Sequence, residues 1–417
     1  MASPKKHIAV GVDIGNSNVI TVVTTQDPET NDVMILGFGD VQSAGMRRGM
    51  VVDIDEVIAA ISNSLEEAER MAGIPIDRAV VSISGQHVHS SNSRGVVAVS
   101  RSTGEIAKED IDRVIEAAKA FSMPANREVI HILPRFFIVD GESGIKDPLG
   151  MKGIRLEVDA HVITASSPVV KNLLKCAYQA GADVEELVLA SLACSKVILS
   201  RKQKEAGVVL IDIGGSSTEI AVFEEGEVLH THSIPLGGTT ITNDIAVCLR
   251  TSIETAEKVK IEYGSAFPTV ASEKEILELA HLDPMLEGQE ISRKYILEII
   301  NARLEEIFTM VKDELRRIGR DGLLPAGAVI TGGGSRIDGI VDVARESLRL
   351  PAQVGSILTS LNSIDKDMVA NPSFATAIGL AIWGLEEHKA ENFMKGMFDQ
   401  VKGKGFSDMF KNIMKKR

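Results

Sequence analysis

One segment constrains the fold of this chain more than any other, because it joins a strand pattern to a turn that suits phosphate. Residues 210–223 read LIDIGGSSTEIAVF. An apolar run ends at Asp212, small residues follow, and alternating apolar residues resume, which predicts a strand, a tight turn and a second strand. The glycines allow close approach of a ligand, and N–H groups in such a turn form a concavity suited to anions. A carboxylate beside phosphate requires a cation between them, so Asp212 predicts Mg²⁺, held directly or through water.

A second copy of this segment occurs near the N-terminus, where residues 10–23 read VGVDIGNSNVITVV. Aligning Asp13 with Asp212 brings the glycines and serines of the two turns into register. Two such hairpins about half a chain apart are a much stronger signal than one. The alternative, two ordinary core hairpins, stays open here but is less favoured. The candidate phosphate contacts in the two turns are Gly15, Asn16, Ser17, Asn18, Gly214, Gly215, Ser216 and Ser217.

A third glycine-rich turn, GGGS, follows the short strand AVIT at residues 328–331. A helix with Ile337 on its apolar face is expected to begin there, and its N-terminus would offer free N–H groups to a nucleotide. The sequence fits neither the dinucleotide pattern nor GxxxxGK[ST], which indicates a nucleotide site of another design. Gly237 and Gly238, which precede an expected helix, are further candidates. So are Glu257 and Lys260, which carry opposite charges three residues apart on one face of an expected helix. The candidate nucleotide contacts outside the hairpins are Gly237, Gly238, Glu257, Lys260, Gly332, Gly333, Gly334, Ser335 and Ile337.

Length and charge limit the class of protein. The 417 residues predict two or three domains. A net charge of −13 argues against a general nucleic-acid binder. Cys176, Cys194 and Cys248 show no metal spacing, which suits a reducing cytoplasm. We expect neither a signal peptide nor a bilayer-spanning segment, since no apolar run approaches the ~20 residues needed to span.

Hydrophobic periodicity outside the turns predicts two α/β halves separated by an insertion. A helix is expected at 54–71, capped by Asp53 or Asp55. Residues 85–166 break the α/β rhythm and predict a compact βαβ-type module. Residues 239–318 are expected to be mostly helical, and 371–384 to form a buried helix. The remaining expected strands are 33–39, 78–84, 95–99, 129–139, 155–165 and 184–189, and the remaining helices 107–120, 168–180, 191–200 and 292–318.

Two pairs of histidines lie two residues apart, His87 with His89 and His230 with His232, and the second pair alternates along an expected strand. Each pair could face one way and bind a metal. We interpret both pairs as surface or hydrogen-bonded histidines, with the metal site as the less favoured alternative.

The end of the chain differs from the rest in charge. From Lys402 onward, five lysines and one arginine stand against one aspartate, a net +5 on a chain of net −13. At helical spacing the apolar and basic side chains of 406–417 separate onto opposite faces, which predicts a helix lying on an anionic membrane surface. Docking on a protein groove stays open as the alternative. The membrane candidates are Phe406, Met409, Phe410, Lys411, Ile413, Met414, Lys415, Lys416 and Arg417.

The two hairpins and AVITGGGSRIDGI resemble the phosphate-1, phosphate-2 and adenosine motifs of the actin superfamily of ATPases. The insertion, the helical block, the terminal helix and the stretches SAGMRRGMVVDIDEVI, GIRLEVDAHVIT and IPLGGTTIT narrow the resemblance to the bacterial cell-division family FtsA. It covers essentially the whole chain. It implies an α/β, actin-like two-lobed fold with ribonuclease-H-like cores, an inserted subdomain in the first half, and ATP with Mg²⁺ in the cleft, positioned by Asp13 and Asp212.

The resemblance also implies a domain order. Residues 386–404 would be a linker, part of which (393–401) has helical spacing and could fold on binding. The implied units are 1–84 (first core), 85–166 (family-specific insertion), 167–238 (second core), 239–320 (helical, partner-binding), 321–385 (second core continued, with a last helix that could return to the first core), 386–404 (linker) and 405–417 (membrane helix).

Partners follow from the same resemblance. Family members polymerise head to tail as protofilaments, bind the C-terminal tail of the tubulin-like protein FtsZ, and tie it to the inner membrane at the division septum. Anionic lipids and other division proteins would be further partners, and nucleic acid would not. Because the family's FtsZ contact lies in the helical block, Lys294 and Arg303 are candidates, with plain solvated surface as the alternative.

One stretch departs from the pattern of vigorous superfamily ATPases, which carry Gln or Glu shortly before the second hairpin. Here ELVLASLACSKVIL offers Ala190 and Ser191, neither of which accepts a proton well near neutral pH. We therefore expect ATP binding with slow or absent hydrolysis. A sugar or acid kinase using the same cleft is the alternative enzyme, and a chaperone-type ATPase is a third hypothesis.

Overall fold

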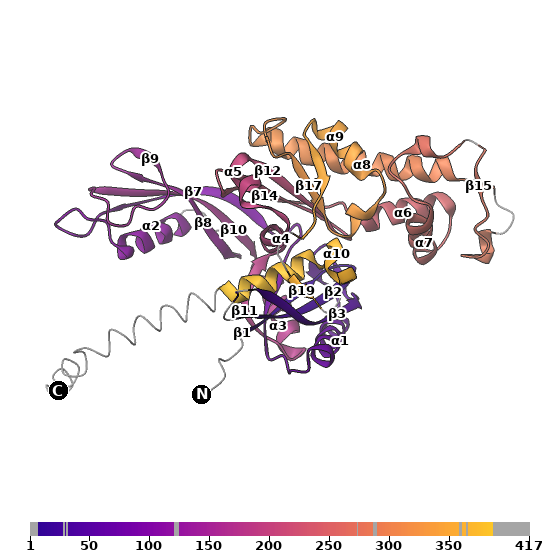
Figure 1. Cartoon of the computed structure of the whole chain (residues 1–417), viewed down its shortest axis with the longest axis horizontal. Helices are drawn as coiled ribbons and strands as arrows, with labels where there is room; N and C mark the ends of the chain where they lie inside the picture. Colours follow the sequence, from indigo (N-terminus) through magenta and orange to yellow (C-terminus); the bar gives the residue numbers. More distant parts are fainter. Residues whose placement is uncertain are drawn as a thin grey trace.

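The computed structural model describes residues 7–27, 30, 32–120, 125–272, 274–286, 290–357, 361–363 and 366–386. Two sheets lie one above the other in the centre of the molecule, the inserted module extends to one side, and the helical block to the other (Figure 1). The expected linker beyond residue 386 and all nine membrane candidates lie outside the described residues. No helix of the described part combines the length and apolar character needed to cross a bilayer.

The first sheet has six strands, in which β1 and β2 form the first hairpin. Its order is β11 (Asp183–Leu189), β6 (Arg78–Ile83), β1 (His7–Ile14), β2 (Asn18–Gln26), β3 (Val33–Gln42) and β19 (Leu361–Ser363). Helices α1 (Ile54–Ala72) and α3 (Ser167–Gln179) share a hydrophobic core with it. Asp53 caps α1 by accepting from the N–H groups of Asp55 and Glu56, as one of the two predicted caps. A small hairpin, β4 (Met46–Arg47) and β5 (Met50–Val51), lies before α1.

The second sheet has five strands and contains the second hairpin, β12 with β13. Its order is β14 (Glu227–Ile234), β13 (Thr218–Glu224), β12 (Val208–Ile213), β17 (Ala328–Thr331) and β18 (Ala352–Val354). The largest core of the described chain joins this sheet to the helical block and to α9 (Ile340–Leu348). The block consists of α6 (Gly238–Leu249), α7 (Ile253–Tyr263), α8 (Arg293–Arg317), the 3₁₀ turns η1 (Pro268–Val270) and η2 (Pro284–Leu286), and the two-residue strands β15 (Ile276–Leu277) and β16 (Ile291–Ser292).

The inserted module has a four-stranded sheet and a core of its own. Its elements are β7 (His89–Ala98), α2 (Lys108–Ala120), β8 (Arg127–Val139), β9 (Glu142–Ile145) and β10 (Arg155–Ser166). Strand β10 lies antiparallel between β7 and β8, so β7–α2–β8 is a split βαβ unit. The predicted start of the first strand at Gly95 was wrong, because the polar run from His89 pairs along its whole length with β10. Backbone pairing there does not need the apolar alternation on which the prediction relied.

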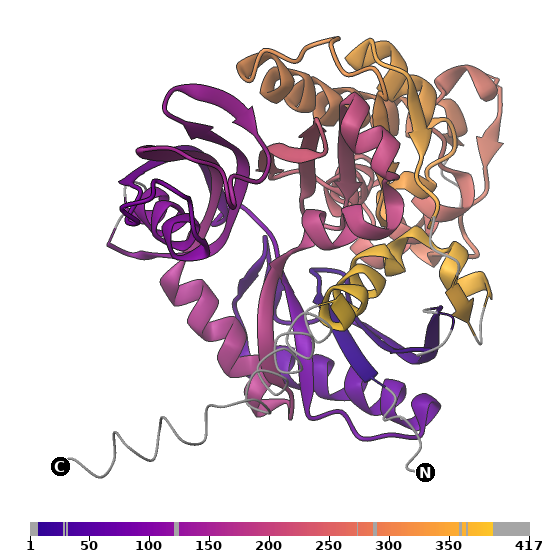
Figure 2. The ribbon, with the colours of Figure 1, turned by 60° about the vertical axis from the view of Figure 1, so that its left-hand side comes forward.

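Two crossing helices connect the sheets (Figure 2). They are α4 (Ala190–Ile198) and the helix at 375–386. A Cβ at Gly379 would lie 2.0 Å from the carbonyl oxygen of Ala193, and one at Gly11 2.3 Å from that of Ala377. Only glycine permits backbones to pack this closely. Side chains from both sheets, such as Ile20 and Leu210, share one core with the second helix, so this is where the two lobes are coupled.

The assignment of residues 167–189 to the second core was wrong. Strand β11 pairs in parallel with β6 of the first sheet, and α3 packs on the first lobe's core. Chain order suggested the second lobe, but these residues return to the first sheet before α4 crosses over. Two later segments also return to the first lobe. Strand β19 pairs with β3, and the helix at 375–386 packs against Gly11 of β1. The remaining boundaries stay a prediction. The expected helix 191–200 corresponds to α4, which ends at Ile198, and a separate capped helix, α5 (Arg201–Ala206), follows it. The last described segment adds α10 (Lys366–Ala370) and η4 (Pro372–Phe374).

Candidate nucleotide cleft

The two repeated turns have the same backbone geometry. The N–H of Gly15 donates to the carbonyl of Asn18 at 3.0 Å, and the N–H of Gly214 donates to that of Ser217 at 3.0 Å. Each turn closes an antiparallel hairpin, so the predicted strand–turn–strand arrangement is confirmed for both copies. A Cβ at Gly15 would lie 2.7 Å from the carbonyl oxygen of Asn18, which explains why glycine occupies the position.

The tips of the two turns face each other. A Cβ built on Gly215 would lie 2.1 Å from Oγ of Ser17, although nearly 200 residues of sequence separate them. The two lobes therefore bring the tips of the repeated turns next to each other. This is the arrangement that a triphosphate held by both turns requires.

Each tip is anchored differently to its own lobe. At the first tip, the N–H of Ser43 donates to Ser17 O at 2.8 Å and that of Gly49 donates to Asn16 Oδ1 at 3.1 Å. At the second, the N–H of Gly238 donates to Gly214 O at 2.9 Å, and the next N–H donates to the carbonyl of Gly215. The second turn thus rests on the N-terminus of α6, and Gly237 is pressed against it.

Three carboxylates, those of Asp13, Asp212 and Glu219, lie behind the turns. Asp13 and Asp212 are half-buried, and Glu219 is buried. Burial raises the pKa of Asp13 to about 6, against a hydrogen bond from Ser82 that lowers it. Burial, followed by repulsion from Asp13 and Glu219, raises the pKa of Asp212 to about 7. Like charges gathered in a poorly solvated place favour a divalent cation between them.

Glu219 was missed by the sequence analysis. It is buried, burial raises its pKa to about 6, and its Oε1 accepts from Ser217 Oγ at 3.0 Å, Ser233 Oγ at 2.8 Å and the N–H of Gly85 at 3.1 Å. Since Gly85 follows the first sheet, Glu219 joins the two lobes. An available signal was a charged residue directly before the apolar run 220–223, opposite Asp212 in the hairpin register.

The predicted pair on α7 lies beneath the second turn. Lys260 Nζ donates to Gly238 O at 3.3 Å, Thr242 Oγ1 at 2.8 Å and Glu257 Oε2 at 2.6 Å. The structure thus brings Glu257, Lys260, Gly237 and Gly238 together beside the cleft. A direct contact of this pair with nucleotide stays a prediction.

The third turn also reaches the cleft. Gly332 has φ of 79°, and a Cβ there would lie 2.2 Å from Asp212 Oδ1. A Cβ at Gly334 would lie 2.4 Å from Cγ2 of Ile213, and Ser335 Oγ donates to Gly332 O at 2.7 Å. Both glycines therefore pack on the end of β12.

The expected helix immediately after the third turn was wrong. Residues Gly333–Arg336 form a 3₁₀ turn, η3, and α9 begins only at Ile340. Gly339, at φ 80° against the ring of Phe267, separates the two elements, and Ile337 is extended. The spacing of apolar residues was helical because Ile337 packs on the same core as α9, which a periodicity argument does not distinguish from helix.

The cleft fits a phosphate–cation ligand by two observations. Ser216 Oγ in the second turn is buried and has no hydrogen-bond partner among the described residues, whereas buried hydroxyls are normally paired. The second observation is the cluster of Asp13, Asp212 and Glu219, whose mutual repulsion a divalent cation would relieve. Ala190 and Ser191 lie at the N-terminus of α4, and both are buried.

The two partner candidates on α8 lie in different surroundings. Arg303 Nε donates to Asp244 Oδ2 at 2.7 Å and Nη2 to Oδ1 at 3.0 Å, a two-pronged pair with α6. Lys294 is half-buried in the first turn of α8. A groove of about 360 Å³ between α6 and α8 includes Arg303 but not Lys294. It is lined by Asp244, Val247, Cys248, Ile299, Ala302, Arg303 and Glu306.

Solved structures with a similar fold are actin-like. The chain resembles a type IV pilus biogenesis complex of PilM and PilN, with a TM-score of 0.67, 19% identity, and coverage of 90% of this chain and 98% of that one. It also resembles MreB5 of Spiroplasma citri bound to ADP, with a TM-score of 0.53, 15% identity, and coverage of 94% and 99%. These likenesses concern the fold. Together with the twin hairpins they define an actin-like, two-lobed α/β protein with an inserted subdomain, as predicted.

Sequence relatives identify the family within that class. A family model described as "Cell division protein FtsA" matches residues 209–379, and one described as "SHS2 domain inserted in FTSA" matches residues 85–164. Cell division protein FtsA of Pseudomonas aeruginosa is 38% identical over 400 residues, covering 95% of this chain and 93% of that protein. FtsA of Bacillus subtilis is 41% identical over 374 residues, covering 90% and 82%. The chain belongs to the FtsA family of cell-division proteins.

Proposed function

We propose that this FtsA-family chain binds ATP with Mg²⁺ between its lobes, assembles into actin-like protofilaments, and anchors the FtsZ tail to the cytoplasmic face of the bacterial inner membrane at the septum. The observation that carries the nucleotide part is the meeting of the two turn tips in front of three clustered carboxylates. Membership of a cell-division family supports the choice of partners.

The cleft residues divide the work of binding. N–H groups of the two hairpin turns bind phosphate oxygens, while Asp13 and Asp212 hold Mg²⁺ through water. The Gly332–Ser335 turn, which abuts Asp212, supports the adenosine end. Mg²⁺ supplies neutralisation of phosphate charge. Ala190 and Ser191 offer no group that accepts a proton well at neutral pH, so we expect slow or absent hydrolysis and a protein whose nucleotide state mainly sets the lobe arrangement.

The groove beside Arg303 is our proposed FtsZ contact. Val247 is exposed beside the α8 side chain of Ile299, and Arg303 supplies a cation held in place by Asp244. A peptide with apolar and acidic side chains would fill the groove and share Arg303 with Asp244. Lys294, nearer the start of the helix, remains the second candidate.

The membrane part depends on residues 405–417. A basic helix with one apolar face binds anionic surfaces, and each basic residue near such a surface contributes about 1 kcal/mol. The inserted module is the candidate surface for other division proteins, and nucleic acid is not a proposed partner of a chain with net charge −13.

A two-variant experiment tests the proposal. Deleting residues 406–417 should abolish flotation with anionic vesicles and leave Mg·ATP affinity unchanged. Asp212→Ala should do the opposite, weakening Mg·ATP while vesicle binding persists. Undiminished vesicle binding by the truncated chain, or undiminished nucleotide affinity of Asp212→Ala, would contradict the corresponding half. Electron microscopy on lipid monolayers with and without ATP then tests protofilament formation.

A further inference from the structure

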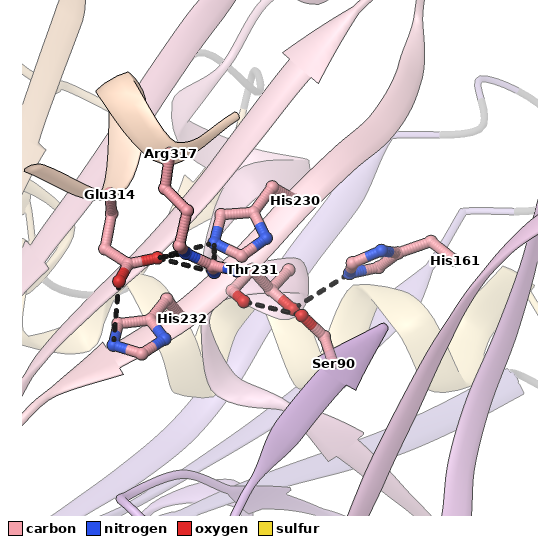
Figure 3. A network of polar contacts seen from close by, with 7 residues as sticks. All are labelled: Ser90, His161, His230, Thr231, His232, Glu314 and Arg317. Carbon is pink, nitrogen blue, oxygen red and sulfur yellow. Dashed lines mark hydrogen bonds and ion pairs between the residues drawn. The ribbon is translucent and has the colours of Figure 1, made fainter. Parts of the chain in front are cut away.

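One face of β14 and the end of α8 bring together three side chains that can bind a metal. His230 and His232 alternate along β14, and Glu314 approaches them from α8 (Figure 3). One ligand atom from each of the three lies within 4.8 Å of the other two. None of the three residues is among the nucleotide-contact candidates, and the proposed function does not use them.

The separations are close to those of a metal site. His230 Nε2 lies 3.1 Å from Glu314 Oε2, and His232 Nε2 lies 3.6 Å from Glu314 Oε1. Ligands about 2.0–2.1 Å from a tetrahedral Zn²⁺ stand about 3.4 Å apart. Both separations, each to a different oxygen of Glu314, are within a few tenths of an ångström of that value. Two histidine nitrogens and one carboxylate form a donor set that Zn²⁺ accepts, with a fourth position left for water.

Arg317 is the side chain that now satisfies this cluster. Its Nη2 lies 2.7 Å from Glu314 Oε2 and 3.1 Å from His230 Nε2. Nε2 of His230 therefore faces a donor and an acceptor at once, and a neutral imidazole nitrogen can match only one of them. Arg317 lies in the last turn of α8 with 59% of its side chain exposed, so it can rotate into solvent without a change in the backbone.

We propose that His230, His232 and Glu314 form a binding site for a borderline divalent cation such as Zn²⁺, which displaces the Arg317 guanidinium. The cation replaces one positive partner of Glu314 with another and resolves the mismatch at His230. It joins the C-terminal end of α8 to the edge strand of the second sheet. Thr231, between the two histidines, contacts the inserted module through Ser90 and His161, so the cation would stiffen the strand against which that module packs.

A titration of the full chain with Zn²⁺ tests the proposal. Millimolar Mg²⁺ in the buffer occupies sites that prefer a hard cation, and Cys248→Ser in every variant removes the exposed thiol. We expect one saturable site, measured by competition with a chelating dye. His232→Ala and Glu314→Gln should each lower the affinity by about 100-fold or more, since loss of even an outer-shell partner costs roughly 10–100-fold.

Arg317→Gln distinguishes a metal site from a merely structural cluster. It removes the competing cation, so Zn²⁺ affinity should rise about tenfold, whereas a structural role predicts no gain. His281→Ala is the matched control, because His281 lies 3.7 Å from the carboxylate of Glu262 but outside the proposed site. The Zn²⁺ affinity of this variant should equal that of the parent. Equal binding by the parent and His232→Ala, absence of a saturable site, or weaker binding by Arg317→Gln would each overturn the proposal. Thermal melts without metal confirm that each variant is folded.

Discussion

The two hairpins of the cleft share one backbone and differ in their surroundings. Both close with the same 3.0 Å bond from a glycine N–H, and both place an aspartate at the end of the first strand. Burial raises the pKa of both, to about 7 for Asp212 and about 6 for Asp13, and a hydrogen bond lowers each, from Thr376 and from Ser82 respectively; Asp212 differs because two further carboxylates repel its charge. A repeated sequence therefore reproduces a turn, but not the electrostatics of the site.

The tips differ in the same way. The first tip is held by two N–H groups of a later loop, one of which donates to the side-chain oxygen of Asn16. The second tip is held by backbone hydrogen bonds from the N-terminus of α6. Of the two hairpins, it is the second that the third turn contacts, where Gly332 abuts Asp212. We expect changes on the second side to have larger effects, and the following predictions test this asymmetry in descending order of size.

Gly332→Ala should have the largest effect. Its φ of 79° is unfavourable for alanine, and the new Cβ would lie 2.2 Å from Asp212 Oδ1. Left-handed strain and overpacking together should reduce the free energy of unfolding by about 2–5 kcal/mol, measured by urea denaturation. Gly333→Ala is the matched control, because its Cβ would meet only Ser373 Oγ at 3.4 Å. Equal stability of the two variants would show that the third turn does not pack closely against Asp212.

Neutralising the aspartates should stabilise the protein when no divalent cation is present. At pH 8 with EDTA, Asp212→Asn should raise the free energy of unfolding by about 1–3 kcal/mol and Asp13→Asn by less, since a one-unit pKa shift corresponds to about 1.4 kcal/mol. Both should weaken Mg·ATP binding. Asp110→Asn is the opposite control: hydrogen bonds and Arg113 hold the pKa of Asp110 well below its usual range against the effect of burial, so its loss should destabilise. A larger gain in the free energy of unfolding from Asp13→Asn than from Asp212→Asn would contradict the proposed difference between the two hairpins.

The pH dependence of stability should separate the cleft from the buried histidines. Folding raises the pKa values of Asp13, Asp212 and Glu219. Their contribution to the free energy of unfolding is therefore fully present below pH 4 and is lost as pH rises to about 6–7. Burial lowers the pKa of His131 to about 4 and of His161 to about 3, so their contribution is present above pH 6.5 and is lost as pH falls.

These opposite slopes make a double variant informative. Without divalent cations, the parent's free energy of unfolding should vary little between pH 6.5 and 5. In Asp13→Asn/Asp212→Asn the histidine effect remains, and stability should fall on acidification by about 1–2 kcal/mol per pH unit. Denaturant midpoints across this range provide the measurement. Parallel curves for parent and double variant would show that the cleft carboxylates ionise normally.

The smallest effect is expected at the tips. Asn16→Ala removes the bond to the N–H of Gly49 and should reduce the free energy of unfolding by about 1 kcal/mol. Ser216→Ala should be neutral or slightly stabilising, because its buried Oγ has no partner within the described chain, and its effect should appear in nucleotide affinity instead. Urea denaturation and nucleotide titration of both variants distinguish these roles. A large stability loss in Ser216→Ala would mean that its hydroxyl has a structural role.

By itself the sequence determined the features that depend on near neighbours. The two Asp–Gly turns, the long helices α1 and α8, the inserted module and the family follow from periodicity, turn residues and motifs separated by a few positions. These signals are strong because side-chain direction repeats every 3.6 residues in a helix and every two in a strand.

Only the tertiary structure decided what distant segments form together. Strand β11 joined the first sheet through parallel pairing with β6, β7 extended through a polar run, and Glu219 reached the N–H of Gly85 across the lobes. Glu314 met His230 and His232 although about 80 residues separate them. Backbone pairing and charge clustering of this kind depend on distances through space, and no local pattern of residues specifies those distances.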